Sequence, residues 1–230
     1  MKRILSLLFA VSLLCTFSMA QKATDYDPEN DHVKVTLTDG GVVEGYVQTY
    51  WTQGKLFKRM NTTFTMTPTP GSDDVKTYSA DDVISVEFVK RVSPDGSYDK
   101  LYSRLVANPS LLRPRRVTRQ FVYAEGANAA GEMYWWNGVD SQNMQLGRMN
   151  ISTIYGVCLQ GDSVVVPFMT GRVISLNAMR IRYKKSAPGL VDYVDRRVLK
   201  GGRKLWDTIA ANPMMFLEIC KEYFEKEADR

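Results

Sequence analysis

The chain has 230 residues, of which 44% are hydrophobic and 24% are charged, with 16 Gly and 9 Pro. This composition excludes an intrinsically disordered, collagen-like or coiled-coil protein and supplies enough apolar side chain for a sizeable core. The 30 Lys and Arg residues outnumber the 25 Asp and Glu residues by five, a mild excess that requires no nucleic-acid partner.

The first 20 residues have the organisation of a secretory signal peptide. Lys2 and Arg3 form a short cationic start, an apolar run covers 4–17, and 18–20 (SMA) has the small-x-small form that signal peptidase cuts. The apolar run is shorter than the about 20 residues that a membrane helix needs. We therefore expect export to the periplasm or cell surface, with residues 1–20 removed and no transmembrane span in the mature chain.

Removal of the signal peptide changes the charge and the cysteine count. The mature chain holds 28 basic and 25 acidic residues, a net charge of +3. Cys15 follows Leu14 instead of the small residue of a lipoprotein signal, which disfavours lipidation. Cys158 and Cys220 remain, and two cysteines are no disulfide framework. We expect two buried thiols, with a single bridge between them as the alternative.

The mature chain begins with a polar, acidic and aperiodic stretch over 21–32, which predicts a mobile N-terminus. Its alternate carboxylates over 25–31 lack the Gly and the final Glu of a calcium loop, so we expect a solvated tail. Apolar and polar residues then alternate on both sides of a turn at 39–41 (DGG), which predicts a β-hairpin. Further strands are expected at 62–67, 75–79, 83–92 and 98–106. Together these patterns predict a barrel-like β unit over 33–106.

Two prolines and four arginines over 107–119 predict a linker. A second antiparallel β unit is expected over 120–187, with the segment 126–131 (GANAAG) as a hairpin loop. The strands of this unit are predicted at 120–124, 132–137, 152–159, 162–168, 172–176 and 179–184.

Helical spacing of apolar residues appears only after Pro188-Gly189. We expect one helix to end at Gly201-Gly202, a second helix to follow, and Asn212-Pro213 to start the last one. The apolar face of that last helix consists of Phe216, Ile219, Cys220, Tyr223 and Phe224. The predicted fold class is therefore α+β and mainly antiparallel β, with amphipathic helices over 188–230.

Residues 33–92 resemble the small β-barrels of Sm-like and SH3-like proteins. The likeness is carried by 33–40 (VKVTLTDG) and 43–47 (VEGYV), with Met60-Asn61 where such proteins have a similar pair. The Arg-Gly step of the Sm RNA site is absent, and 82–86 (DVISV) stands in its place. The resemblance thus implies a barrel without RNA binding. The whole layout is similar to uncharacterised exported proteins of Gram-negative bacteria, a likeness that implies no activity.

The segment Gly161-Asp162-Ser163 is similar to the nucleophile segment of trypsin-like proteases, but valines replace the glycines that follow it there. A serine nucleophile needs a base, and the single histidine, His32, lies in the predicted tail. We therefore expect a turn followed by a buried strand. One histidine and two scattered cysteines give no zinc ligand set, and no cofactor motif is present. Ser163 matches a short O-glycan acceptor pattern and is a possible glycosylation site, a better one than Thr208 because it lies near a turn.

The aromatic run Tyr134, Trp135 and Trp136 supplies the candidate ligand-binding residues. In a strand, Trp135 faces away from the other two rings, so one side is core and the other is available for a ligand. Such rings build stacking platforms for sugars in carbohydrate-binding modules. Two carboxylates of a glycoside hydrolase could come from anywhere in a fold, but Asp73-Asp74 and Asp81-Asp82 both lie beside turn signals.

These observations favour a non-catalytic exported envelope protein that acts as a binding or interaction module. Its expected partner is an unknown envelope protein or a glycan, with no cofactor, no metal and no nucleic acid. The alternative is a carbohydrate-binding accessory protein that uses the aromatic face, and a carboxylate-dependent hydrolase is the third and less favoured class.

Overall fold

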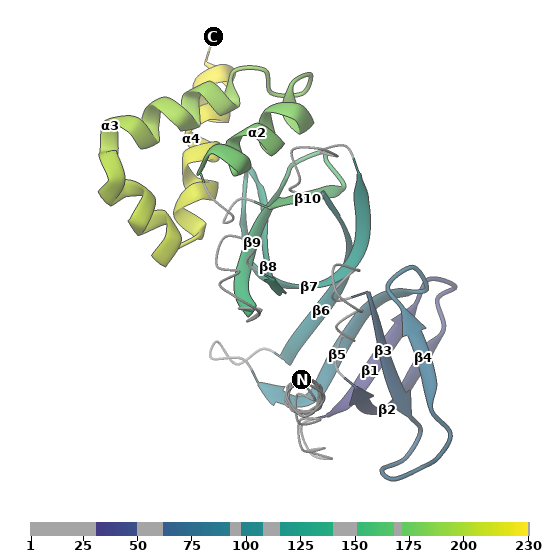
Figure 1. The fold of residues 1–230 in the computed structure, drawn as a ribbon. Helices are drawn as coiled ribbons and strands as arrows, with labels where there is room; N and C mark the ends of the chain where they lie inside the picture. The colour runs from purple at the N-terminus through teal and green to yellow at the C-terminus, as the bar shows by residue number, and fades with distance from the viewer. Residues whose placement is uncertain are drawn as a thin grey trace, which may run out of the picture.

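The computed structural model describes residues 31–49, 62–92, 98–107, 116–139, 151–167 and 172–229. The predicted signal peptide, most of the predicted tail and linker, and the pair Met60-Asn61 lie outside these described residues. Within them the chain forms strands first and helices last, as Figure 1 shows.

The strands of the first half are β1 (His32–Leu37), β2 (Val42–Thr49), β3 (Thr63–Thr67), β4 (Lys76–Ser79) and β5 (Val83–Val92). Those of the second half are β6 (Tyr98–Ala107), β7 (Val117–Asn128), β8 (Gly131–Val139), β9 (Ile151–Leu159) and β10 (Val164–Pro167). The described helices are α2 (Arg172–Tyr183), α3 (Leu190–Ala211) and α4 (Met214–Ala228).

These strands form one sheet in the order β10-β9-β8-β7-β6-β5-β1-β2-β3-β4. Strand β10 also returns to β6 in parallel, with Val164 opposite Leu105 and Val165 opposite Val106. This pairing closes β6–β10 into a five-stranded barrel, the ring at the centre of Figure 1. The predicted fold class, α+β with mainly antiparallel sheet, is therefore confirmed. The closed ring takes β6 from the predicted barrel-like unit 33–106 and its other strands from the region after it.

Strands β1–β5 curl around an apolar core. The turn between β1 and β2 forms because the Asp39 carboxylate accepts a hydrogen bond of 2.8 Å from the Gly41 N–H and Gly40 adopts a φ of 87°. Phe64, Phe88 and nine further side chains make up the buried cluster. Two of its members, Leu101 and Phe121, come from the barrel strands β6 and β7. The curled sheet and the barrel therefore share this core.

The barrel interior is filled by side chains from all five of its strands. Its buried members are Val106, Val122, Tyr134, Trp136, Cys158 and Val165. The indole of Trp136 lies so close to Gly156 that a Cβ added there would be 2.9 Å from the ring. Only glycine therefore fits at this position of β9. The predicted hairpin loop at 126–131 is a tight turn at 129–130, and its outer residues belong to β7 and β8.

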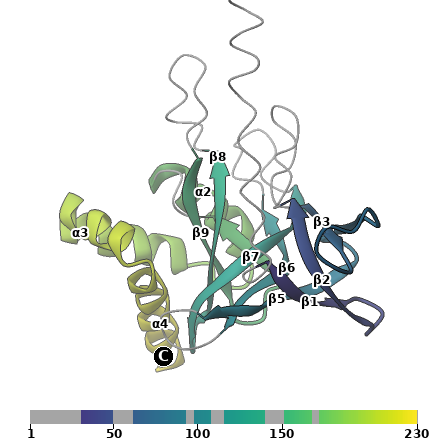
Figure 2. The same cartoon turned by 90° about the horizontal axis from the view of Figure 1, so that it is seen from below.

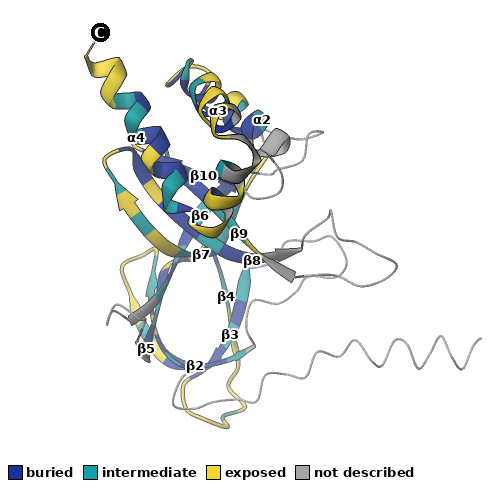
Figure 3. Ribbon diagram, turned by 90° about the vertical axis from the view of Figure 1, so that its left-hand side faces the viewer, coloured by how far each residue is buried: buried dark blue, intermediate teal, exposed yellow. Residues whose placement is uncertain are grey.

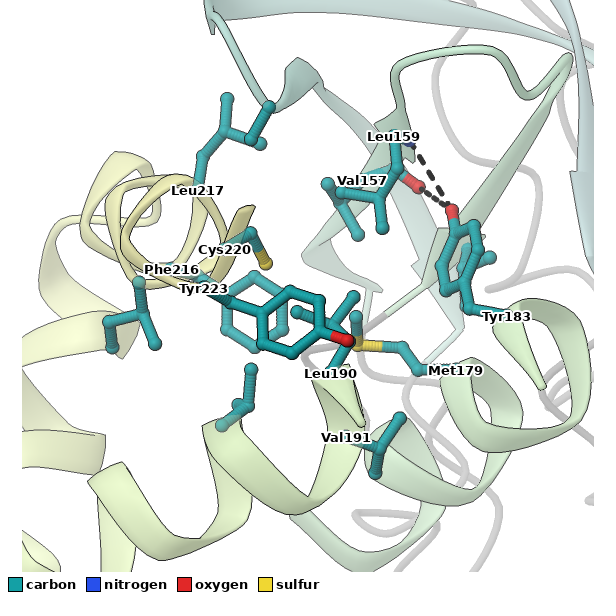
Figure 4. Close-up of a cluster of buried hydrophobic side chains, with 14 of the residues drawn as sticks. Val157, Leu159, Met179, Tyr183, Leu190, Val191, Phe216, Leu217, Cys220 and Tyr223 are labelled. Carbon is teal, nitrogen blue, oxygen red and sulfur yellow. Dashed lines mark hydrogen bonds between the residues drawn. The ribbon is translucent and has the colours of Figure 1, made fainter. Parts of the chain in front are cut away.

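The helices cover the outer face of β7–β10 and bury the largest core cluster. Met179, Leu190 and Phe216 are fully buried in it, and Figure 4 shows them converging with Tyr223 and Cys220. Tyr183 anchors α2 to the sheet, since its hydroxyl accepts a hydrogen bond of 3.4 Å from the Leu159 N–H. Figure 2 shows the helices on one side of the barrel, away from β1–β4.

Two predictions about the helical region were wrong. The expected strands at 172–176 and 179–184 are the helix α2, whose buried residues Leu176, Met179 and Tyr183 have helical spacing. The expected break at Gly201-Gly202 does not occur, because α3 runs through it and is buried on both sides, at Val198 and Ile209.

The restart at Asn212-Pro213 is confirmed, since α3 ends just before it and α4 begins just after it. The backbone carbonyl of Asn212, and not its side chain, accepts the Met215 N–H at 3.1 Å. The predicted apolar face is also confirmed, because Phe216, Ile219, Cys220 and Tyr223 are buried and Phe224 packs against them. Among the described helices, none combines the length and the apolar character that a membrane crossing requires.

Candidate functional site

The structure places the three predicted ligand-binding residues on two faces of β8. Tyr134 and Trp136 point into the barrel, where they are 2% and 6% exposed. Trp135 lies on the outer face and is only half-buried. The alternation expected from a strand is therefore present, and of the three rings only that of Trp135 is available to a ligand.

The register of the sheet brings two further rings to Trp135. Tyr123 of β7 and Tyr155 of β9 are its direct partners on the neighbouring strands. The rings of Tyr123 and Trp135 are stacked, with 4.2 Å between centroids and 15° between planes. All three side chains are partly exposed. We call Tyr123, Trp135 and Tyr155 the aromatic row.

The aromatic row is held in place by the cores on both sides of it. Tyr123 packs against the core of the curled sheet, and Tyr155 packs against the core under the helices. Partial burial, with a smaller contribution from the negative charge of Glu125, raises the pKa of Tyr155. A phenolic hydroxyl is both a hydrogen-bond donor and an acceptor. The row combines apolar ring surface, phenolic hydroxyls and the exposed carboxylate of Glu125.

Sequence reasoning found one member of this row and missed two. Trp135 was recognisable because it stands in an aromatic run, whereas Tyr123 and Tyr155 are isolated in their own strands. The signal that would have found them is strand register, which a sequence without its long-range pairings does not give.

A polar cluster adjoins the buried Tyr134 and consists of the half-buried Arg104 and the exposed Glu132. The guanidinium of Arg104 lies over the rings of Tyr102 and Tyr134, at 5.2 and 5.6 Å from their centroids. Its Nε donates a hydrogen bond of 2.9 Å to the Tyr134 hydroxyl, which in turn donates to the carboxylate of Glu132. Burial and the bond to Glu132 raise the pKa of Tyr134 to about 12. The Tyr134 hydroxyl thus both accepts and donates a hydrogen bond within the protein, and these bonds hold its ring in the barrel interior.

The segment 161–163 forms the predicted turn, and all four residues of β10 after it are buried. The Asp162 carboxylate accepts hydrogen bonds from the Ser163 N–H at 2.7 Å and the Val164 N–H at 3.3 Å. It also accepts two from Arg182 of α2, one of them from Nε at 2.7 Å. Partial burial opposes ionisation, but these bonds outweigh it and hold the pKa of Asp162 below its ordinary value. Ser163 itself is exposed.

A cavity of about 360 Å³ lies between this turn and the ends of α2 and α4. Asp162 and Arg182 contribute its charges, which pair with each other, and Tyr183 and Phe224 contribute its rings. The Tyr183 hydroxyl is turned toward the Val157 carbonyl, 3.5 Å away, and burial raises its pKa. The charges of the cavity are thus balanced within the protein, which leaves it no net charge for a ligand.

The two cysteines are free and buried, which confirms the prediction of two buried thiols. Burial, with smaller contributions from Asp162 and Glu132, raises the pKa of Cys158 to about 11. Burial alone raises the pKa of Cys220. Both sulfurs are therefore protonated at neutral pH and are poor nucleophiles.

The remaining candidates take structural positions. His32 begins β1 instead of lying in a tail, and its ring stacks on Tyr46 with 4.8 Å between centroids. The carboxylates of 73–74 and 81–82 are exposed in turns. Among the described residues, no group of three potential ligands could hold a metal ion.

No family model, curated protein or solved structure matches the chain.

Proposed function

We propose that the protein is an exported, non-catalytic binding module of the cell envelope, with the aromatic row as its ligand face. The observation that carries the proposal is the alignment of Tyr123, Trp135 and Tyr155 on three neighbouring strands of a closed barrel. A closed barrel holds such side chains rigidly, so little conformational entropy is lost when a ligand binds. The signal-peptide pattern of residues 1–20 supports export.

A glycan is the ligand class that this surface fits best. Neighbouring strands are about 5 Å apart, so three aligned residues span about 10 Å of surface. Ring edges and faces offer contact to the C–H groups of a sugar, while phenolic hydroxyls and Glu125 offer hydrogen-bond partners to its hydroxyls. A sugar chain presents the same two kinds of group along its length. The aromatic row therefore supports the carbohydrate-binding form of the module.

The proposal is tested by titrating the exported form of the protein with soluble envelope and cell-wall polysaccharides while the tryptophan fluorescence is followed. Trp135→Ala should weaken binding by about tenfold or more, because large aromatic side chains dominate binding surfaces. Tyr78→Ala is the matched control, since Tyr78 is also half-buried and stacked, 5.4 Å from Phe64, but lies on the curled sheet. Equal weakening in both variants, or no glycan binding at all, would contradict the proposal.

Cross-linking in native envelopes separates a glycan ligand from a protein partner. Glycan recovered with the wild type and lost with Trp135→Ala supports the aromatic row as the ligand face. Recovery of one stoichiometric protein without glycan would indicate that the protein is a protein-interaction module and not a carbohydrate-binding one. Amino-terminal sequencing of the envelope protein tests export by itself, and the expected first residue is Gln21.

A further inference from the structure

The charge of the chain is concentrated in one segment. Residues 172–204 contain ten basic and two acidic residues, a net charge of +8, whereas the whole chain has a net charge of +5. The remainder of the chain is therefore net negative. The basic segment covers α2, the turn after it and the first two-thirds of α3.

Part of this positive charge is used inside the protein. Arg182 pairs with Asp162 of the β9–β10 turn, and Arg197 pairs with Glu222 of α4 at 3.4 Å. Partial burial opposes ionisation of Glu222, but the bonds from Arg197 and Tyr193 hold its pKa below its ordinary value. These two arginines therefore fasten α2 and α3 to their neighbours.

Five of the other basic side chains are exposed on α2, α3 and the turn between them. Asp192, Arg196 and Lys200 follow each other at a spacing of four on the outer side of α3. Arg180 of α2 lies beside them, because its Nη2 is 3.3 Å from Asp192 Oδ1, and Arg196 Nε donates to the Asp192 carbonyl at 3.2 Å. The turn after α2 adds two exposed lysines. We define the basic stripe as Arg180, Lys184, Lys185, Arg196 and Lys200.

The basic stripe faces away from the core of the protein. The buried side of α3 consists of Leu190, Val191, Val194, Val198 and Ile209. Figure 3 shows the outer turns of α3 as exposed, at the opposite end of the molecule from β2 and β3. Asp192 forms an ion pair with Arg180 of the stripe. The stripe thus presents five exposed basic side chains, one of which pairs with Asp192.

We infer that the basic stripe docks the protein on an anionic phospholipid membrane. Several lysines and arginines on one exposed helical surface bind acidic lipid headgroups cooperatively. A membrane fits better than a small anion, because none of the stripe residues lines the described cavity and each side chain stands on the outer side of a helix or turn. The apolar side of α3 is occupied by the core, so the attachment is electrostatic and peripheral. This inference does not depend on the aromatic row.

Vesicle flotation of the exported form of the protein tests the inference. The probes are vesicles with about one-third phosphatidylglycerol in phosphatidylcholine and vesicles of phosphatidylcholine alone, at about 50 mM and about 300 mM salt. The wild type should float with the anionic vesicles at low salt and be released at high salt, because screening weakens exposed charges. It should not float with the neutral vesicles.

Two triple variants with the same change in net charge make the test specific. K184E/K185E/K200E reverses three charges of the stripe and should reduce binding to anionic vesicles by about tenfold or more. K34E/K76E/K90E reverses three exposed lysines of the curled sheet and should bind as the wild type does. Circular dichroism of both variants establishes that they are folded.

Three outcomes would overturn the inference. The first is equal flotation with neutral and anionic vesicles, the second is equal loss in both triple variants, and the third is binding to soluble polyphosphate without any binding to vesicles. Loss confined to K184E/K185E/K200E would support it. The single substitution Lys200→Gln should also reduce binding to anionic vesicles, but by less than the triple variant does.

Discussion

The curled sheet β1–β5 and the barrel β6–β10 use the same number of strands but are filled differently. The curled sheet has an apolar core, with Phe64 and Phe88 as its largest members. The barrel encloses fewer buried side chains and also holds the guanidinium of Arg104 against two tyrosine rings. This charged group is tolerated there because it is only half-buried, is hydrogen-bonded and lies over aromatic faces.

This comparison indicates that the two halves of the sheet have different roles. The interior of the curled sheet supplies stability through apolar burial. The barrel fixes side chains on both of its faces, so that one strand, β8, supplies Tyr134 to the interior and Trp135 to the aromatic row. The predictions below test whether the two halves differ in the way that their interiors suggest.

The largest effects are expected from removing one large ring from each half. Phe64→Ala and Trp136→Ala should each lower the free energy of unfolding by about 3–5 kcal/mol, because both rings are buried and leave cavities. Urea unfolding followed by circular dichroism measures both losses. Val42→Ala, at a side chain 52% exposed, is the control and should change little. A loss below about 1 kcal/mol in Trp136→Ala would show that the barrel interior is not a packed core.

A smaller effect is expected where the barrel wall admits no side chain. Gly156→Ala should cost about 1–3 kcal/mol, because the new Cβ would lie 2.6 Å from Val165 and 2.9 Å from the Trp136 ring. Adding Val165→Ala to this variant removes one of the two clashes, so part of the melting temperature should return. If the double variant is less stable by the full sum of the two changes, the overlap is not the cause of the loss.

The next effect is expected at the β9–β10 turn, which is hydrogen-bonded to α2 through Asp162 and Arg182, and it depends on pH. Asp162→Asn should lower the free energy of unfolding at neutral pH by about 1–2 kcal/mol, because it removes charge-assisted bonds from Arg182. The pKa of Asp162 is lowered in the folded protein, so its stabilisation is present above the unfolded value near 3.9 and is lost as the pH falls through the folded value. The two proteins should therefore converge in acid, and a difference that is independent of pH would contradict this account.

The smallest effect is expected at the junction of the two halves, between β5 and β6. Glu87 and Lys100 are cross-strand partners whose charged atoms are 3.4 Å apart, and both are more than one-third exposed. Glu87→Gln should cost less than about 1 kcal/mol, because water and salt screen an exposed pair. A double-mutant cycle with Lys100→Met measures the coupling, and a coupling unaffected by salt would be inconsistent with a solvated pair.

Those secondary-structure elements that are determined by residues close together in the sequence were predictable. The Asp-Gly turn, the alternation of β1 and β2 and the Asn-Pro start of α4 all depend on neighbouring residues. Helix α2 was not predictable in this way, because 172–176 and 179–184 alternate over lengths too short to distinguish a strand from a helix. Tertiary packing of Leu205 and Ile209 likewise carries α3 through Gly201-Gly202, where local propensity predicts a break.

The candidate site was predictable only in part, for a related reason. The inward and outward faces of β8 follow from the two-residue period of a strand, so the separation of Trp135 from its neighbours was expected. Its partners Tyr123 and Tyr155 depend on the register of three strands. The basic stripe depends in the same way on the contact between α2 and α3, which brings Arg180 beside Asp192.

The parallel strand pair that closes the barrel also affects the order in which the strands pair during folding. Leu105 of β6 and Val164 of β10 are about 60 residues apart in the chain, whereas the neighbouring hairpins join at short range. Closing a long loop costs more entropy than forming a hairpin, so we expect the ring to close after its hairpins have formed. Until β10 pairs with them, β9 and the carboxyl-terminal end of β6, at Leu105 and Val106, each expose an unpaired edge on which another chain could assemble. A chain made from its amino terminus presents this part of β6 early and its cover β10 late, and we expect the protein to be most open to aggregation and to chaperones in this interval.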